Sequence, residues 1–124
     1  MREALRFKTV KEERKFYYFK SDGIHYTVKV NDIVYFQNDR YNVFVHCVDG
    51  SVIETPYKSN RTILLELQSD RFLKCNKNTI VNVDFVSNVD PVNRYIQLTD
   101  GHGILELGAR LRHSFLEGMV KCSK

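Results

Sequence analysis

A polar patch between two apolar runs lies near the middle of this 124-residue chain, where residues 72–82 read FLKCNKNTIVN. Phe72 to Cys75 has the composition of a strand, Asn76 to Asn78 is polar, and an apolar pair follows at residues 80–81. Short runs of apolar and β-branched residues bounded by polar residues are typical of strands. The segment therefore predicts strand character on both sides of a polar patch.

Upstream of this segment, short strand signals follow one another with turn residues between them. At residues 24–30 every second residue is apolar, which is the period of a half-buried strand. Asp49 and Gly50 form a strong hairpin signal. Five strands are predicted in the first 57 residues: Phe16–Lys20, Ile24–Val30, Ile33–Phe36, Tyr41–Val48 and Ser51–Thr55. Their short connections predict a meander of antiparallel pairs rather than a βαβ series.

The downstream half adds two helix signals to further strands. Ser59 is an expected helix N-cap, and the spacing of Ile63, Leu64 and Leu67 predicts a short helix over residues 62–68. The other elements expected are strands at Val86–Val89, Arg94–Leu98 and Ile104–Leu107, and a helix from Gly108 to Val120. The predicted fold class is mainly β, antiparallel, with two short helices.

Length and charge set broad limits on function. A chain of this length fits one domain with a single modest core. Nineteen Lys and Arg residues against 15 Asp and Glu give a net charge of +4, and residues 1–20 alone hold seven basic and three acidic side chains. The remainder is therefore near neutral, so any further basic surface must be created by folding. Such a balance permits binding to a polyanion without requiring it.

The chain lacks signals for membrane insertion or export. Its apolar runs are far shorter than the roughly 18 residues that span a bilayer, and no apolar stretch follows the basic N-terminus as in a secretion signal. Cys47, Cys75 and Cys122 are odd in number and form no CxxC pair. The sequence therefore predicts reduced thiols and a cytoplasmic location, with Cys47 and Cys75 packed as small hydrophobic residues.

Motifs that carry catalysis or bind metals are missing from the sequence. It contains no glycine-rich phosphate loop, GxSxG, HExxH or zinc-type cysteine pairing. His46 and Cys47 are neighbours on a predicted strand, so their side chains point to opposite faces. A Cys75–His pair assembled by folding is the weak remaining route to hydrolase activity. We expect no enzyme activity, metal, cofactor or small-molecule substrate.

The order of these elements resembles the LytTR family of bacterial DNA-binding domains. After residues 72–82 come an apolar run at residues 83–89, a short turn and a strand that ends at Asp100-Gly101; upstream, DIVYFQ at residues 32–37 precedes a polar turn and a strand. The resemblance covers about residues 15–118. It implies an elongated, mainly β fold of consecutive sheets at residues 15–124, preceded by a linker or trimmed N-terminal segment at residues 1–14.

The resemblance also implies a transcriptional regulator, the C-terminal output domain of a two-component response regulator. Family members insert loop residues into successive major grooves on one face of bent double-stranded DNA, usually at paired repeats. A promoter with paired repeats is thus the implied partner, on which two copies could form a homodimer. The residues that match contacting positions are Arg40, Tyr41 and Asn42 in the first loop, Lys74, Asn76, Lys77 and Asn78 in the polar patch, Arg94 in a turn, and Arg110 and Arg112 at the last helix.

Two of these places depart from the family pattern. Relatives often have His where this chain has Asn76, so a different base preference is expected there. The last helix of relatives commonly begins with Ser-Arg-Arg, whereas residues 108–110 read Gly-Ala-Arg. Only Arg110 therefore matches, and Arg112 is the candidate to compensate.

The chemistry of these side chains suits the implied roles, although each also has an ordinary explanation. Arg can donate two hydrogen bonds to guanine, Asn can pair with adenine, and Lys is a point charge for phosphate. In turns, however, Arg and Lys are often simply solvated, and Asn often serves backbone geometry. Asn82 is interpreted in that second way, as a cap or backbone partner.

Two further expectations complete the interpretation. The provisional core consists of Phe36, Phe44, Val45, Ile80, Val81, Phe85, Ile96 and Leu98. The alternative to DNA binding is a β-rich protein-interaction or sensory domain whose exposed strand edges recruit a partner.

Overall fold

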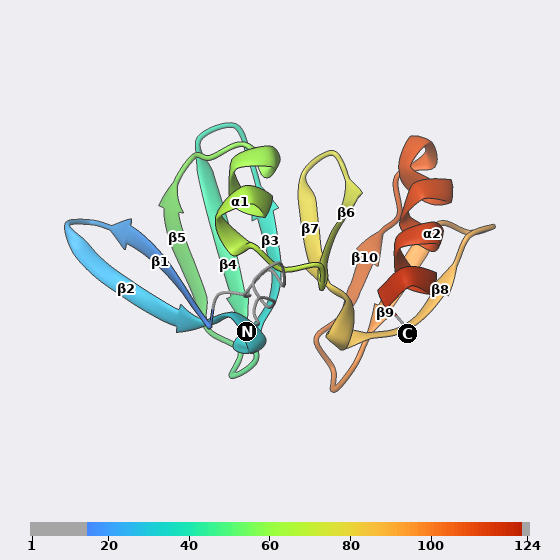
Figure 1. The fold of residues 1–124 in the computed structure, drawn as a ribbon, viewed down its shortest axis with the longest axis horizontal. Coiled ribbons are helices and arrows are strands. Elements are labelled where there is room, and N and C mark those ends of the chain that lie inside the picture. Colours follow the sequence, from blue (N-terminus) through green and yellow to red (C-terminus); the bar gives the residue numbers. More distant parts are fainter. Residues whose placement is uncertain (1–14, 123–124) are drawn as a thin grey trace, which may run out of the picture.

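A computed structural model describes residues 15–122, so the predicted linker at residues 1–14 lies outside the described residues. Three antiparallel sheets follow one another along the longest axis of the molecule (Figure 1). The first sheet contains β1 (Phe16–Ser21) and β2 (Ile24–Lys29). The second contains, in spatial order, β5 (Val52–Pro56), β4 (Asn42–Cys47), β3 (Ile33–Asn38), β7 (Thr79–Asn82) and β6 (Phe72–Asn76). The third contains, in spatial order, β10 (Ile104–Glu106), β9 (Tyr95–Leu98) and β8 (Val86–Asp90).

Two α-helices and three short 3₁₀ turns complete the described fold. Helix α1 (Asn60–Leu67) covers one face of the five-stranded sheet, and α2 (Arg112–Cys122) lies beside β6 and the third sheet (Figure 1). The 3₁₀ turns are η2 (Val30–Asp32), η3 (Val83–Phe85) and η4 (Ala109–Leu111). This arrangement confirms the predicted fold class, including the consecutive sheets.

The pairing of β3 with β7 brings distant parts of the sequence together. The two strands are antiparallel, with Phe36 opposite Ile80 and Gln37 opposite Thr79. The end of β3 therefore lies beside the start of β7. As a consequence, the β3–β4 loop and the β6–β7 hairpin leave the sheet at the same edge. Here, edge means the side of a sheet formed by the ends of its strands, not an outermost strand.

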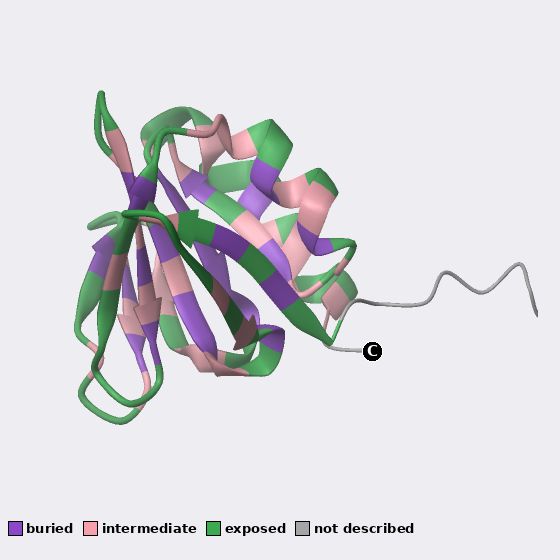
Figure 2. Cartoon of the chain, turned by 90° about the vertical axis from the view of Figure 1, so that its left-hand side faces the viewer, coloured by how far each residue is buried: buried purple, intermediate pink, exposed green. Residues whose placement is uncertain are grey.

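Two clusters of buried side chains hold the sheets together. In the first, Phe19 of β1 and Ile63 and Leu67 of α1 pack with Phe36 of β3. In the second, residues of β3, β6 and β7 pack with the third sheet and with Phe115 of α2. Figure 2 shows buried residues alternating with exposed ones along the strands, whereas the turns are mostly exposed. The turns thus project from a scaffold fixed by two cores.

Most sequence-based predictions are confirmed, with local exceptions. Ser59 caps α1, because its hydroxyl accepts a hydrogen bond from the Thr62 amide at 3.1 Å. Asn82 is buried and serves backbone geometry: its amide donates to the Ile33 carbonyl and accepts from the Asp84 amide. Phe44 and Phe85, however, are only half-buried. Phe44 lies on the face of β4 opposite its buried neighbours, so alternation along the strand excludes it from the core.

The last helix begins differently from the prediction. Residues 109–111 form a 3₁₀ turn, and the α-helix starts only at Arg112. Short 3₁₀ segments are frequent at helix ends. Among residues 15–122, no helix is long and apolar enough to cross a bilayer.

Candidate nucleic-acid interface

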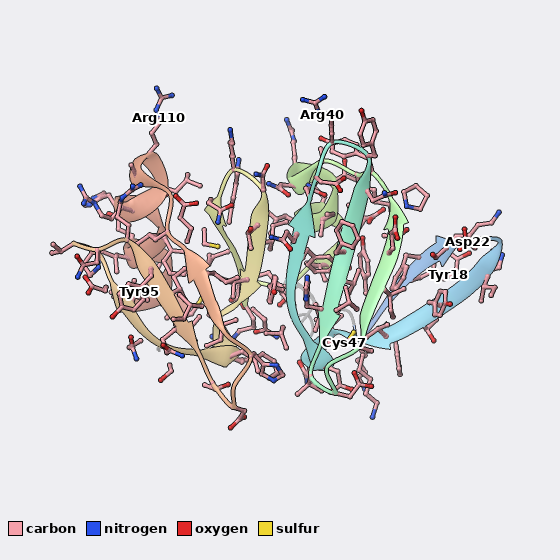
Figure 3. The ribbon with its side chains drawn as sticks, turned by 180° about the vertical axis from the view of Figure 1, so that it is seen from behind. Tyr18, Asp22, Arg40, Cys47, Tyr95 and Arg110 are labelled. Carbon is pink, nitrogen blue, oxygen red and sulfur yellow. The ribbon has the colours of Figure 1, made fainter. Side chains whose placement is uncertain are left out.

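Cationic side chains gather at the edge where β3 and β7 meet. Figure 3 shows Arg40 at the β3–β4 loop and Arg110 beside the third sheet, both on the same side of the molecule and directed away from its body. Lys77 lies at the tip of the β6–β7 hairpin, which leaves the sheet on that same side. Arg94, in the β8–β9 turn, lines a groove with Lys77 and Arg110. All four residues are exposed, and together they are called the basic edge.

The β3–β4 loop is closed by the Asp39 carboxylate. That carboxylate accepts hydrogen bonds from the backbone amides of Tyr41 and Asn42, each at 2.7 Å, and the Asp39 amide donates to the Asn42 carbonyl at 3.0 Å. The two bonds from Tyr41 and Asn42 lower the pKa of Asp39. Arg40 and Tyr41 are exposed at the tip, and Asn42 is partly buried. Asp39, which the sequence analysis left out, therefore sets the conformation that presents Arg40.

The β6–β7 hairpin is held from both sides by Asn76. Its side-chain oxygen accepts from the Asn78 amide at 2.9 Å, and its nitrogen donates to the Glu106 carbonyl of β10 at 2.8 Å. Asn76 was predicted to read bases; these two bonds engage its side chain with the backbone of the hairpin and of β10. Lys74, Lys77 and Asn78 are exposed.

A chain of amides links the hairpin to the β3–β4 loop. The Asn38 side chain donates to the Asn60 side chain at 2.7 Å, and Asn60 donates to the Lys77 carbonyl at 3.0 Å. In addition, the Asn38 backbone amide donates to the Asn78 carbonyl at 2.7 Å. The sequence analysis missed Asn38 and Asn60, because a polar residue at a strand end or helix start is locally unremarkable.

The start of the last helix packs closely on the same hairpin. The Gly108 amide donates to the Cys75 carbonyl at 2.8 Å. A Cβ atom on Gly108 would lie 3.3 Å from the Cα atom of Asn76, tighter than most contacts of this kind. The side-chain bond from Asn76 to the Glu106 carbonyl and the backbone bond from Gly108 to Cys75 thus tie the segment that bears Arg110 to the hairpin that bears Lys77.

A groove of about 390 Å³ separates the hairpin, the β8–β9 turn and η4. Its basic lining residues are Lys74, Lys77, Arg94 and Arg110, and its one acidic lining residue is Glu106. A concave surface with such an excess of cations favours phosphate groups. Asn76 and Asn78 also line this groove.

Arg112, Tyr41 and Asn42 do not line this groove. Arg112 donates to the Pro91 carbonyl at 3.1 Å and so braces the β8–β9 turn. Arg94 adopts a left-handed conformation in that turn, with φ of 60°. Tyr41 and Asn42 line a separate pocket beside β5.

Burial makes Cys75 and Cys47 poor nucleophiles. Burial raises the pKa of the Cys75 thiol to about 12, so the thiolate needed for attack is scarce at neutral pH. Cys47 is also buried, and burial raises the pKa of its thiol. Within residues 15–122, no group of three or more His, Cys, Asp or Glu side chains is placed to hold a metal ion.

The fold and this edge define a class of protein: a mainly β domain that presents cationic and amide side chains from several loops along one edge. The chain belongs to the LytTr DNA-binding domain family, whose model matches residues 24–116. Its structure is similar to that of a LytTr DNA-binding domain of a methyl-accepting/DNA response regulator from Bacillus cereus, with a TM-score of 0.68 and 14% identity. The match covers 86% of this chain and 97% of that one. No curated protein matches the chain.

Proposed function

We propose that this domain binds specific double-stranded DNA sequences through its basic edge and acts as the output domain of a transcriptional response regulator. The carrying observation is that Arg40, Lys77 and Arg110, which are separated in sequence by more than 30 residues each, project from one edge of the sheet stack. Several donors aligned on one side are what a rod-like polyanion requires.

Strand spacing supports a division of labour between the loops. Neighbouring strands lie about 4.8 Å apart, so the centres of the β3–β4 loop and the β6–β7 hairpin are roughly 10 Å apart, two strand spacings in the sheet. A major groove is about 12 Å wide, and successive major grooves are about 34 Å apart. The separation of the loops that bear Arg40 and Lys77 therefore suits one groove and its bordering phosphates, and Arg110, which lines a cavity with Lys77, extends the contact along the DNA toward the next groove.

The side chains suggest which contacts read bases. Arg40 and Arg110 present guanidinium groups that can donate two hydrogen bonds to guanine, and Asn42 and Asn78 are the amides available for adenine. Lys74 and Lys77 suit phosphates. Paired repeats and a homodimer on DNA are part of the same proposal, because family members usually bind such sites.

The test is a titration by fluorescence anisotropy against a duplex selected by the protein from a random pool. The expected affinity falls steeply with salt, with a log–log slope of roughly −4 to −5 if about five phosphates are neutralised. Lys77→Ala and Arg110→Ala should each weaken binding about tenfold. Lys77→Ala should also reduce the magnitude of the slope by about one.

Matched controls remove the same charge elsewhere. Lys29 on β2 and Lys121 at the far end of α2 are exposed cations outside the basic edge, so Lys29→Ala and Lys121→Ala should change the affinity less than about twofold. Binding that ignores salt, or that is lost equally in all four variants, would contradict the proposal. If Lys77→Ala and Arg110→Ala alter nothing, the protein-interaction alternative gains.

A further inference from the structure

We infer that Asn60, the first residue of α1, is a positioning residue that fixes the β6–β7 hairpin relative to the β3–β4 loop and so sets DNA specificity. The inference rests on the proposed function, since it concerns how two loops of the basic edge are kept in register. Asn60 itself need not touch DNA. Its role is to fix the spacing at which Arg40 and Lys77 are presented.

The geometry places Asn60 between the two loops. Its side-chain oxygen accepts from the Asn38 side chain at 2.7 Å, and its side-chain nitrogen donates to the Lys77 carbonyl at 3.0 Å. Asn38 ends β3, two residues before Arg40, and Lys77 is at the hairpin tip. One amide therefore contacts both presenting segments.

The direction of the chain of amides is dictated by its last acceptor. The Lys77 backbone carbonyl can only accept, so Asn60 must turn its nitrogen toward the hairpin. The side-chain oxygen of Asn60 then faces Asn38 and can only accept, so the side-chain nitrogen of Asn38 must be the donor. Because each orientation forces the next, the three residues act as one unit rather than as independent contacts.

This orientation of the Asn38 side chain leaves its oxygen without a donor within the described part of the chain. Its side-chain oxygen is buried and has no hydrogen-bond partner among residues 15–122. An unpaired buried oxygen disfavours the folded state, so an amide at this position is a poor choice for stability alone. Its presence is explained if holding Asn60 and the hairpin matters more than the missing bond.

Asn60 is itself firmly anchored. Ile63 and Leu67 of the same helix are fully buried against the central sheet. The helix start is therefore a rigid platform. The hairpin is thus held by the start of α1 in addition to the pairing of β7 with β3.

The experiment compares specific and non-specific DNA affinity in the full chain. The probes are the duplex selected by the wild-type protein and a scrambled duplex of the same composition, titrated with wild type, Asn60→Ala, Asn38→Ala and the double variant. Each single variant should bind the selected duplex about tenfold more weakly, which converts to loss of an interaction of ordinary hydrogen-bond strength. Binding to the scrambled duplex should change less than about twofold, with an unaltered salt slope, because no phosphate contact is removed.

The double variant and the stability measurement separate positioning from simple loss of structure. Because both residues act through one unit, the double variant should be no weaker than a single variant, whereas independent effects would multiply. Thermal unfolding of Asn38→Ala should occur within a few degrees of wild type, because the variant removes the unpaired oxygen together with the bond to Asn60, and the partly exposed Asn60 can be hydrated instead. If Asn60→Ala fails to fold, Asn38→Ala still tests the proposal.

Ser59→Ala is the matched control, because it removes a hydrogen bond from the same turn of α1 but leaves the chain of amides intact. It should lower the melting temperature while keeping discrimination between the two duplexes. Equal loss of discrimination in Ser59→Ala and Asn60→Ala, multiplicative effects in the double variant, or wild-type specificity in Asn60→Ala would each overturn the inference. A wild-type protein that selects no duplex would instead refute the proposed function.

Discussion

The connections at the two opposite edges of the central and third sheets carry charges of opposite sign. Arg40, Lys77, Arg94 and Arg110 lie in the connections at one edge, and the connections at the other edge contain Asp32, Asp49, Asp84 and Asp100. Antiparallel strands send successive connections to alternate edges. Basic and acidic turns that alternate along the sequence are therefore sorted by the fold into a basic edge and an acidic edge.

Three charged residues lie at the edge of opposite sign, and each has a local hydrogen-bond or ion-pair partner. Asp39 and Asp90 belong to connections at the basic edge, yet their carboxylates accept hydrogen bonds from the backbone of their own turns, which lowers the pKa of each. Arg71 lies toward the acidic edge but is paired with the Asp84 carboxylate and donates to the Cys122 carbonyl. Residues 21–124, which are near neutral in net charge, thus present a surface with a local excess of cations.

Reversing two charges should abolish the difference between the edges and give the largest effect. Lys77→Glu with Arg110→Glu replaces two attractions by two repulsions, so specific affinity should fall by about 1,000-fold. Electrophoretic mobility shift at fixed salt measures the loss. The matched control is Lys29→Glu with Lys121→Glu, which makes the same change in net charge. A similar loss in that control would mean that overall charge, not the basic edge, governs binding.

Much of the fold could be predicted because its signals are local. The alternation at residues 24–30, the Asp49-Gly50 turn and the Ser59 cap each depend on neighbours in the sequence, and all three are confirmed. The pairing of β3 with β7 had no such signal, since it joins strands about 45 residues apart. Phe44 was assigned to the core because its apolarity is visible in the sequence, whereas the side of the sheet left uncovered is not.

A change at the junction between hairpin and last helix tests whether the basic edge is a rigid unit. In Gly108→Ala the new Cβ atom would lie 3.3 Å from the Asn76 Cα atom. Backbone on both sides cannot easily move, so we expect destabilisation of about 1 kcal/mol, as for mild overpacking, despite the usual gain from replacing Gly. DNA affinity should fall about fivefold, because Arg110 shifts relative to Lys77.

Urea denaturation and anisotropy measure the two effects of Gly108→Ala. The control is Ala109→Ser, which adds one atom to the exposed neighbouring residue. Wild-type stability and affinity in Gly108→Ala would show that the junction yields freely and that the edge is not rigid there.

The candidate site was predictable in its cations but not in its supports. Arg40, Lys77 and Arg110 stand out in turns, and the resemblance pointed to them. Asn38 and Asn60 gain a role only through contacts between segments 17 to 22 residues apart. Asn76 shows the converse, because a side chain that looked available for bases is engaged by the Asn78 amide and the Glu106 carbonyl.

The smallest effect on DNA affinity is expected from changes at the acidic edge. This effect tests whether only charges at the basic edge influence binding. Asp49 and Asp100 are exposed in turns, and Asp100 has a φ of 53° that Asn also tolerates. Asp49→Asn with Asp100→Asn removes two negative charges on the side away from the basic edge. At 0.15 M salt the screening length is about 8 Å, so these charges should change specific affinity less than about twofold.

Lowering the salt provides the sharper half of that measurement. At 0.01 M the screening length grows to about 30 Å, comparable with the size of a small domain, and the same double variant should then bind DNA measurably more tightly than wild type. A gain that is already large at 0.15 M would mean that DNA approaches the acidic edge as well. The two edges would then be parts of one binding surface, and the alternation of charged turns would no longer explain where DNA binds.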